Sequence, residues 1–166
     1  WSTENGIQKC NGFTLTQVDN GKDVYVSTNV DTPSGSPVLY VPESLILSSS
    51  KAMDELRTSE MYEAEQLLIN NADGDESDLP QYYLMLKILV EVQKGTDSNW
   101  YQWLNSLPRY FSNAVSMTDY CLLCLPPLMK TLAGEEQDKQ RMLCNKDSLD
   151  KVPFLSESIK SSNTYI

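Results

Sequence analysis

The residues of this chain best suited to chemistry are Cys121 and Cys124, which form a C-x-x-C motif. Two thiolates at this spacing can supply half of a zinc site or act as a redox pair. The remaining cysteines, Cys10 and Cys144, are remote in the sequence, so a complete four-ligand zinc site is not expected. The pair lies in an apolar helix predicted to start near Thr118, and the flanking leucines predict a buried face. A thiol or metal function would instead require exposed thiols with a lowered pKa.

The absence of histidine limits the chemistry further. A chain without imidazole has no Ser–His or Cys–His pair, no side-chain base with an ordinary pKa near neutrality, and no histidine ligand for a metal. Four cysteines in 166 residues are also too few and too scattered for a disulfide framework. We therefore expect mostly free thiols in a reducing compartment. From the residue types we assign no catalytic, cofactor-binding or metal-binding residue.

Charge and hydropathy narrow the range of partners. Thirteen basic residues stand against 23 acidic ones, which gives a net charge of −10. This balance argues against nucleic acid, whose phosphates require a basic surface, and favours other protein subunits with basic surfaces. The longest apolar run, at residues 120–129, is shorter than the ~18 residues that span a bilayer and contains Pro126 and Pro127. We expect no transmembrane segment, and a protein that is soluble or peripheral to a membrane complex.

A central helix is predicted between Pro80 and Lys94. Its polar residues recur at spacings of four and three and form one narrow stripe, whereas almost all other positions are apolar. We therefore expect burial on more than one side. Asp78 is placed to cap the first turn, and Gly95 is placed to end the helix. The residues of the polar stripe are Lys87, Glu91 and Lys94.

A second helix, which follows at once, carries an aromatic stripe. Its members at i, i+3, i+4 and i+7 are Trp100, Trp103, Leu104 and Leu107. Both indoles therefore face the same side, and Pro108 ends the run. We predict that this stripe belongs to the core.

The N-terminal part has the pattern of short β-strands. Alternating apolar residues flank the dipeptide at residues 20–21, Asn-Gly, which is the strongest short hairpin signal, so we predict two adjacent antiparallel strands. A third strand is predicted at residues 38–41, before Pro42. The fold class is α+β, with a small antiparallel β region at about residues 12–47 and a helical region at about residues 50–145.

We divide the chain into three parts. A strand segment occupies residues 1–47, and a helical segment occupies residues 48–133. Residues 134–166 are predicted to be a charged linker and a loosely held tail, because this stretch is rich in charged residues and serine and lacks apolar periodicity.

Two tracts carry a family pattern. The strands lead into VPESLIL at residues 41–47, and the central helix ends in KGTDSNWYQWLNSLP at residues 94–108. These tracts resemble the "xxVPxSLxL" and "KGxxSxWxPYLxxLP" patterns of SET-domain lysine methyltransferases of the Rubisco large-subunit methyltransferase type. Lys94-Gly95, Ser98 and Trp100 match, although Gln102-Trp103 replaces Pro-Tyr. The resemblance covers about residues 12–132 and identifies a SET-like strand segment and an insert-like helical segment.

The resemblance implies methyl transfer from S-adenosylmethionine to lysine, but the chain departs from the family in two ways. Gly21 is kept, whereas Asp23 stands where a second glycine lets the backbone approach the cofactor. The Asn-His pair that binds the cofactor in the family has no counterpart, and Tyr165 has no context that would make it catalytic. We expect the catalytic half to be absent, with Ile166 standing about where that half would begin.

These departures favour a non-catalytic SET-like interaction or scaffold subunit of a larger protein assembly. Such a subunit would expose apolar patches that the missing half otherwise covers. We expect its contacts in the loop-rich N-terminal segment and in the serine-rich tail. Because the relatives are frequent in plastids, we extend this expectation to a peripheral photosystem subunit on the stromal, thylakoid-associated side, with the cytoplasm as the other location. The alternative is the N-terminal part of an S-adenosylmethionine-dependent protein-lysine methyltransferase.

Overall fold

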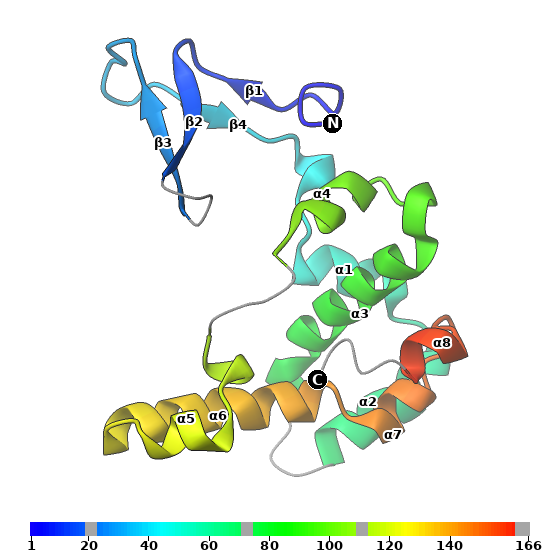
Figure 1. Cartoon of the computed structure of the whole chain (residues 1–166). Helices are drawn as coiled ribbons and strands as arrows, with labels where there is room; N and C mark the ends of the chain where they lie inside the picture. The colour runs from blue at the N-terminus through cyan, green and yellow to red at the C-terminus, as the bar shows by residue number, and fades with distance from the viewer. Residues whose placement is uncertain (19–22, 71–74, 109–112, 162–166) are drawn as a thin grey trace. The chain divides into compact units, whose positions relative to one another are not determined.

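Short strands and helices of four to 17 residues make up the described part of this chain. The computed structural model describes residues 1–18, 23–70, 75–108 and 113–161. Over these residues the chain divides into two units, Trp1–Ile46 and Leu47–Ile166, and the strands belong to the first (Figure 1). The predicted α+β fold class is confirmed, and the first unit ends one residue before the predicted end of the strand segment.

The first unit contains two separate antiparallel strand pairs. Strand β1 (Gln8–Lys9) pairs with β4 (Leu39–Tyr40), and β2 (Phe13–Val18) pairs with β3 (Asp23–Thr28). The two strands of the predicted hairpin are therefore adjacent and antiparallel, while its turn at residues 20–21 lies outside the described residues. The predicted third strand is shorter than expected, because only two of its residues pair, and they pair with β1 rather than with the hairpin.

The second unit is built from helices. The α-helices are α1 (Ser49–Leu56), α2 (Tyr62–Asn70), α3 (Leu79–Lys94), α4 (Tyr101–Ser106), α5 (Asp119–Leu123), α6 (Pro127–Leu143), α7 (Lys146–Asp150) and α8 (Glu157–Lys160). Single 3₁₀ turns connect several of them: η3 (Ser59–Met61), η4 (Glu76–Asp78), η5 (Gly95–Asp97) and η6 (Ala114–Ser116). A further turn, η2 (Glu43–Leu45), closes the first unit.

The core of the second unit forms around α3. Helix α1 packs along α3, and α7 packs on α2. The prediction of a central helix that is buried on more than one side is confirmed, because between Leu79 and Glu91 only Gln81 is exposed. Helix α3 also supplies about a third of the core cluster. That cluster comprises Ala52, Leu56, Met61, Ala64, Leu68, Leu79, Tyr82, Tyr83, Leu86, Leu89, Leu143, Leu149, Val152 and Leu155.

The two ends of α3 differ in how well they were predicted. Gly95 ends the helix with a φ of 55°, a left-handed conformation that favours glycine. The cap prediction for Asp78 is wrong. Its carboxylate accepts a hydrogen bond from the backbone N–H of Asp75 at 3.2 Å and belongs to the capping box of η4, so the preceding turn already uses it.

The aromatic stripe after α3 is less buried than its spacing suggests. Helix α4 starts at Tyr101, and none of its residues is buried. The side chain of Trp103 is exposed, while the ring of Trp100 lies 5.4 Å below the Lys87 ammonium group. The prediction that both indoles belong to the core is therefore wrong. Helix α4 packs mainly on α3 and on the adjoining turn η5, which leaves its outer side to solvent.

The segment after residue 134 belongs to the folded unit. Helix α6 continues through the predicted boundary at residue 133, and four later side chains lie in the same core as α3. They are Leu143, Leu149, Val152 and Leu155. The prediction of a loosely held segment is wrong over residues 143–155, and residues 162–166 lie outside the described part. The pattern escaped detection because these side chains come from different short elements and share no single helical period.

The polar stripe of α3 forms a buried ion cluster. Glu91 is only 2% exposed, and its Oε1 accepts hydrogen bonds from Lys94 at 2.7 Å and from Lys87 at 3.0 Å. Its Oε2 accepts a hydrogen bond from the Ser98 hydroxyl at 2.6 Å. Lys87 also donates to Glu55 of α1 at 2.7 Å. Burial alone would raise the pKa of Glu91, but the three donors together lower it to about 2.

Neutralising Glu91 should destabilise the second unit at neutral pH. In Glu91→Gln the buried Lys87 loses one of its two carboxylates, and we expect the free energy of unfolding to fall by about 3 kcal/mol. The pKa of Glu91 is lower in the folded state than its ordinary value of 4.5. The charged carboxylate therefore contributes its full stabilisation at pH values above about 4.5. The difference between wild type and variant should therefore shrink as the pH falls from about 4.5 to about 2.

Urea unfolding followed by circular dichroism across this pH range measures the difference. Glu157→Gln, which alters an exposed pair with Lys160, is the matched control and should leave the unfolding midpoint nearly unchanged. A constant difference between wild type and Glu91→Gln at every pH would contradict the assigned role.

Candidate functional site

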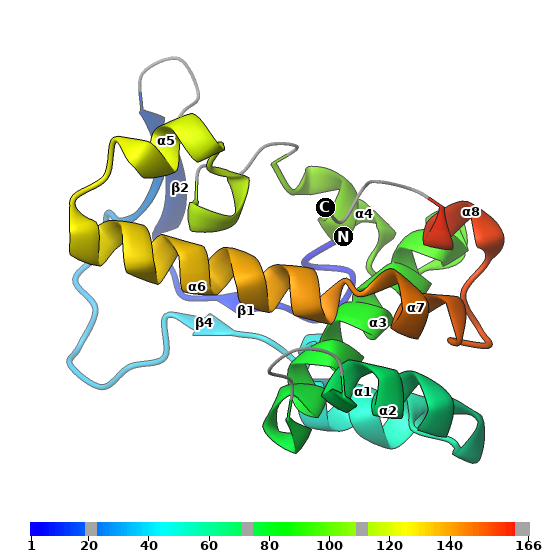
Figure 2. The same cartoon turned by 90° about the horizontal axis from the view of Figure 1, so that it is seen from below.

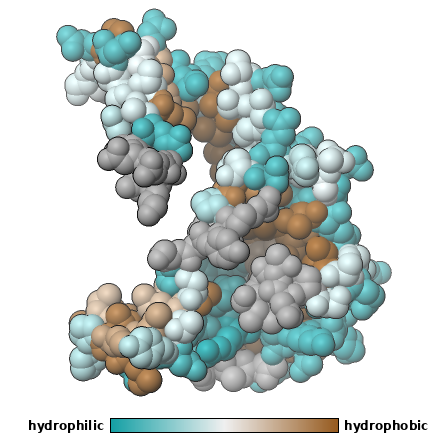
Figure 3. Space-filling model, in the orientation of Figure 1, coloured by the Kyte–Doolittle hydropathy of each residue, from teal (hydrophilic) through white to brown (hydrophobic). Residues whose placement is uncertain are grey.

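Apolar side chains stay exposed where α5 meets α6. The two helices contact each other and run side by side in both views (Figures 1 and 2). On α5, Tyr120 is 77% exposed and Leu123 is 70% exposed, and on α6 Leu128 is 71% exposed. Met129 and Leu132 extend the α6 side of this surface, and apolar side chains gather over this end of the molecule in Figure 3. We call these five side chains the α5–α6 patch.

The chain bends sharply between the two helices. Thr118 caps α5, because its hydroxyl accepts a hydrogen bond from the backbone N–H of Cys121, as the predicted helix start near Thr118 requires. Pro126 is the N-cap of α6, and Pro127 is its first residue. Since proline disrupts the interior of a helix and suits its first turn, the apolar run divides between the five-residue helix α5 and the first turn of the 17-residue helix α6.

Helix α6 presents one side to the protein and the other to solvent. Its buried side includes Ala133 and Gln137, which is one helical turn further on. The Gln137 amide donates to the carbonyls of Ala114 at 3.0 Å and Met117 at 2.8 Å, and this holds the η6 region against α6. Leu128 and Leu132 lie elsewhere on the circumference, whereas Met129 lies one turn before Ala133 on the same side of α6 and is 52% exposed. Most of the charged residues beside the patch are acidic, namely Asp119, Glu135 and Glu136, all exposed.

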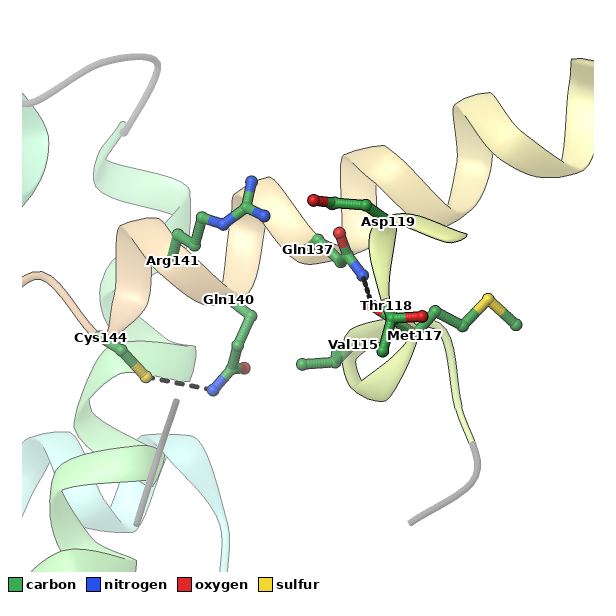
Figure 4. Close-up of a pocket in the computed structure, with 8 residues that line it drawn as sticks. All are labelled: Val115, Met117, Thr118, Asp119, Gln137, Gln140, Arg141 and Cys144. Carbon is green, nitrogen blue, oxygen red and sulfur yellow. Dashed lines mark hydrogen bonds between the residues drawn. The ribbon is translucent and has the colours of Figure 1, made fainter. Parts of the chain in front are cut away.

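A cavity of about 490 Å³ lies between α6 and the segment that leads into α5 (Figure 4). It is lined by Val115, Met117, Thr118, Asp119, Gln137, Gln140, Arg141 and Cys144. Several of its polar groups have partners within the protein: Arg141 pairs with Asp138 at 2.8 Å, and Gln140 donates to the sulfur of Cys144 at 3.1 Å.

Chemically, this cavity is suited to binding. Its volume falls within the range of ligand pockets. Burial raises the pKa of the Cys144 thiol, so this sulfur is mostly protonated near neutral pH and is a weak nucleophile. The lining mixes apolar side chains with hydrogen-bonding ones, which suits a side chain or small ligand from a partner.

Cys121 on α5 and Cys124, the residue that caps its C-terminal end, are both exposed. The prediction of a buried apolar face is therefore wrong, because helical spacing places both thiols on one side without deciding whether another element covers that side. The Thr118 hydroxyl donates to the Cys121 sulfur at 3.3 Å, and the hydrogen bonds of Thr118 lower the pKa of this thiol. The other two cysteines, Cys10 and Cys144, are partly buried.

The residues that carry the SET resemblance make structural contacts. Lys94 and Ser98 donate to the buried Glu91, and Trp100 lies beneath Lys87. Asp23 is the first residue of β3. The other positions named from the resemblance, Gly21 and Tyr165, lie outside the described residues.

Comparisons with models of protein families, with curated proteins and with solved structures find no match. The SET resemblance therefore stays a prediction. Within the described ranges, none of the helices combines the length and apolarity needed to cross a bilayer. Over those same residues, side chains of the types that bind metals do not gather in groups of three or more.

The hairpin of the first unit also exposes apolar side chains. Leu15 lies opposite Val26 and Thr16 lies opposite Tyr25, so the exposed Leu15 and Val26 share one face while Tyr25 occupies the other. This hairpin lies within the N-terminal segment where we expect partner contacts.

Sequence reasoning missed the α5–α6 patch, although a signal was present. Pro126-Pro127 ends the first helix of this apolar run early, so α5 has only five residues. A helix this short buries one side against its neighbour and leaves most of its apolar side chains in solvent. The run at residues 120–129 thus indicates an exposed apolar surface, in addition to being too short to span a membrane.

We predict that the patch can be altered without unfolding the protein. Leu128→Asp replaces a side chain that is mostly in solvent, so the free energy of unfolding should change by no more than about 0.5 kcal/mol. Leu149→Ala empties a buried position of the core and should cost about 2–5 kcal/mol. Chemical unfolding of both variants measures the contrast, and a large loss in Leu128→Asp would show that the patch is covered within the chain.

Proposed function

We propose that this chain is a non-catalytic SET-like interaction or scaffold subunit of a larger assembly, without methyl-transfer activity of its own. The observation that carries the proposal is the α5–α6 patch. Large apolar side chains that are 70% or more exposed lie together on two adjoining helices. Full burial of each such side chain contributes about 1.5–3 kcal/mol, so a partner that covers the patch gains considerable stability. Contiguous apolar surface of this kind marks protein contacts.

The patch suits a partner with an apolar groove and a basic rim. Tyr120 offers a large ring whose hydroxyl can still reach a polar group, and aromatic residues of this kind often dominate the energy of an interface. The acidic side chains beside the patch and the net charge of −10 attract basic surfaces over a longer range. The neighbouring cavity can accept a side chain from the same partner.

Two observations support a role without catalysis. The chain contains no histidine, so an imidazole base has no source within these 166 residues. The motif residues Lys94 and Ser98 are committed to the buried Glu91 carboxylate, which stabilises the fold. From the resemblance alone we extend the proposal to a plastid assembly, with this chain as a peripheral photosystem subunit on the stromal side.

Photocrosslinking in the source cells tests the proposed contact. A benzoylphenylalanine placed at Leu123 should give one adduct of defined mass, and adding Leu128→Asp should reduce its yield at least tenfold. The matched control places the same group at Glu157, a 90% exposed side chain on α8, where we expect no adduct. Equal labelling from both positions, or an adduct that survives Leu128→Asp, would contradict an interaction through the patch.

Calorimetry with S-adenosylmethionine tests the absence of methyl-transfer activity. We expect no heat of binding when the full chain is titrated to saturating cofactor concentrations, because the Asn-His pair of the resemblance has no counterpart here. Binding with micromolar affinity would overturn the proposal in favour of a methyltransferase.

A further inference from the structure

Two exposed thiols at the end of α5 have no part in the interaction described above. We propose that Cys121 and Cys124 form a redox-active dithiol that reduces an exposed disulfide by thiol–disulfide exchange. Cys121 is the attacking thiol, and Cys124 is the resolving thiol.

The backbone at the end of α5 brings the two thiols together. The N–H of Cys124 donates to the carbonyl of Cys121 at 3.1 Å and to that of Tyr120 at 3.3 Å. The first of these bonds spans three residues, so the last turn is tightened towards a 3₁₀ helix, in which side chains three apart are eclipsed. The next residue continues the pattern, since Leu125 donates to Leu122 at 3.3 Å. The side chains of Cys121 and Cys124 therefore point in more similar directions around the helix axis than they would in a regular α-helix.

Closure of a disulfide requires only a small further movement. The Cβ atoms of residues three apart on a helix are about 5–6 Å from each other, whereas a disulfide holds them at about 3.5–4.5 Å. Cys124 lies just beyond the last residue of α5, where helices fray easily. The proline pair that follows starts a new helix, so the bend can absorb the change without displacing α6.

The surroundings of the two sulfurs assign their roles. The Thr118 hydroxyl donates to the sulfur of Cys121 and stabilises negative charge there, which favours the thiolate that attacks a disulfide. Both thiols are exposed and can meet a disulfide in solution. Cys10 and Cys144 are partly buried, and burial keeps the Cys144 thiol protonated, so they compete poorly.

The reaction proceeds in two exchanges. The Cys121 thiolate attacks one sulfur of a disulfide R–S–S–R′, forms a mixed disulfide with R–S and releases R′–S⁻. Cys124 then gives its proton to solvent, and its thiolate attacks the Cys121 sulfur, which releases R–S⁻. The chain loses two electrons and two protons and gains an internal disulfide, while the substrate becomes two thiols.

Oxidised glutathione serves as the probe disulfide for the full reduced chain. After quenching with N-ethylmaleimide under denaturing conditions, intact mass should show two fewer maleimide adducts than the reduced chain and no lasting glutathione adduct, and peptide mapping should place the bond between Cys121 and Cys124. Cys124→Ser should accumulate one glutathione on Cys121. Cys121→Ser should slow the reaction at least tenfold, whereas Cys10→Ser and Cys144→Ser should react at the wild-type rate.

Three results would overturn the proposal. They are a lasting glutathione adduct on the wild-type chain, a bond that includes Cys10 or Cys144, and an unchanged rate in Cys121→Ser.

The role of Thr118 is tested by the pH profile of Cys121 alkylation with iodoacetamide. Thr118→Val should move the midpoint of the profile to higher pH, because the hydrogen bond to the sulfur is lost. Thr118→Ser retains a hydroxyl that can cap α5 and should restore the wild-type profile. An identical profile in Thr118→Val would show that Thr118 does not activate Cys121.

Discussion

The buried carboxylate of Glu91 is the contact on which the second unit depends. It accepts hydrogen bonds from two lysines of its own helix and from Ser98 in the following turn, while Lys87 extends the cluster to Glu55 of α1. An ionised group in the interior destabilises a protein unless several donors satisfy it in good geometry. The cluster therefore restricts α1, α3 and the turn after α3 to one arrangement, and it accounts for a polar stripe that is buried instead of solvated.

Hydrogen bonds elsewhere in the core extend this restriction to the C-terminal helices. The hydroxyl of Ser148 donates to the carbonyl of Ala64 at 2.9 Å. It lies 2.7 Å from the hydroxyl of Tyr82, and because its own proton is already used, Tyr82 is the donor of this second hydrogen bond. Burial raises the pKa of Tyr82 to about 12, so its hydroxyl keeps the proton that it donates. Helix α7 is thereby joined to α2 and α3. Near the same core, Glu65 accepts from Arg57 at 2.8 Å and from Tyr83 at 2.6 Å.

This distribution of stabilising contacts leaves α5 and the first turns of α6 available for function. The core cluster draws on α1, α2, α3 and the segment from Leu143 to Leu155, whereas the exposed side chains of α5 and α6 contribute nothing to it. The proposed contact surface and the proposed dithiol share α5, so a partner that covers the patch would also control access to Cys121 and Cys124. Sites on short, weakly constrained elements beside a rigid core are common in proteins, because function requires exposure there.

Local features of the sequence determined much of this fold. Apolar periodicity set the extent of α3, Gly95 its end and Thr118 the start of α5, and the strand pattern around residues 20–21 set the pairing of β2 with β3. These features depend on neighbouring residues alone. Only the tertiary structure decided that Glu91 is buried, that Trp103 and the two cysteines of α5 are exposed, and that Leu149 belongs to the core. Burial depends on which parts of the chain, distant in sequence, pack against each other. The spacing of residues on one face of a helix is the same whether that face is covered by protein or by water.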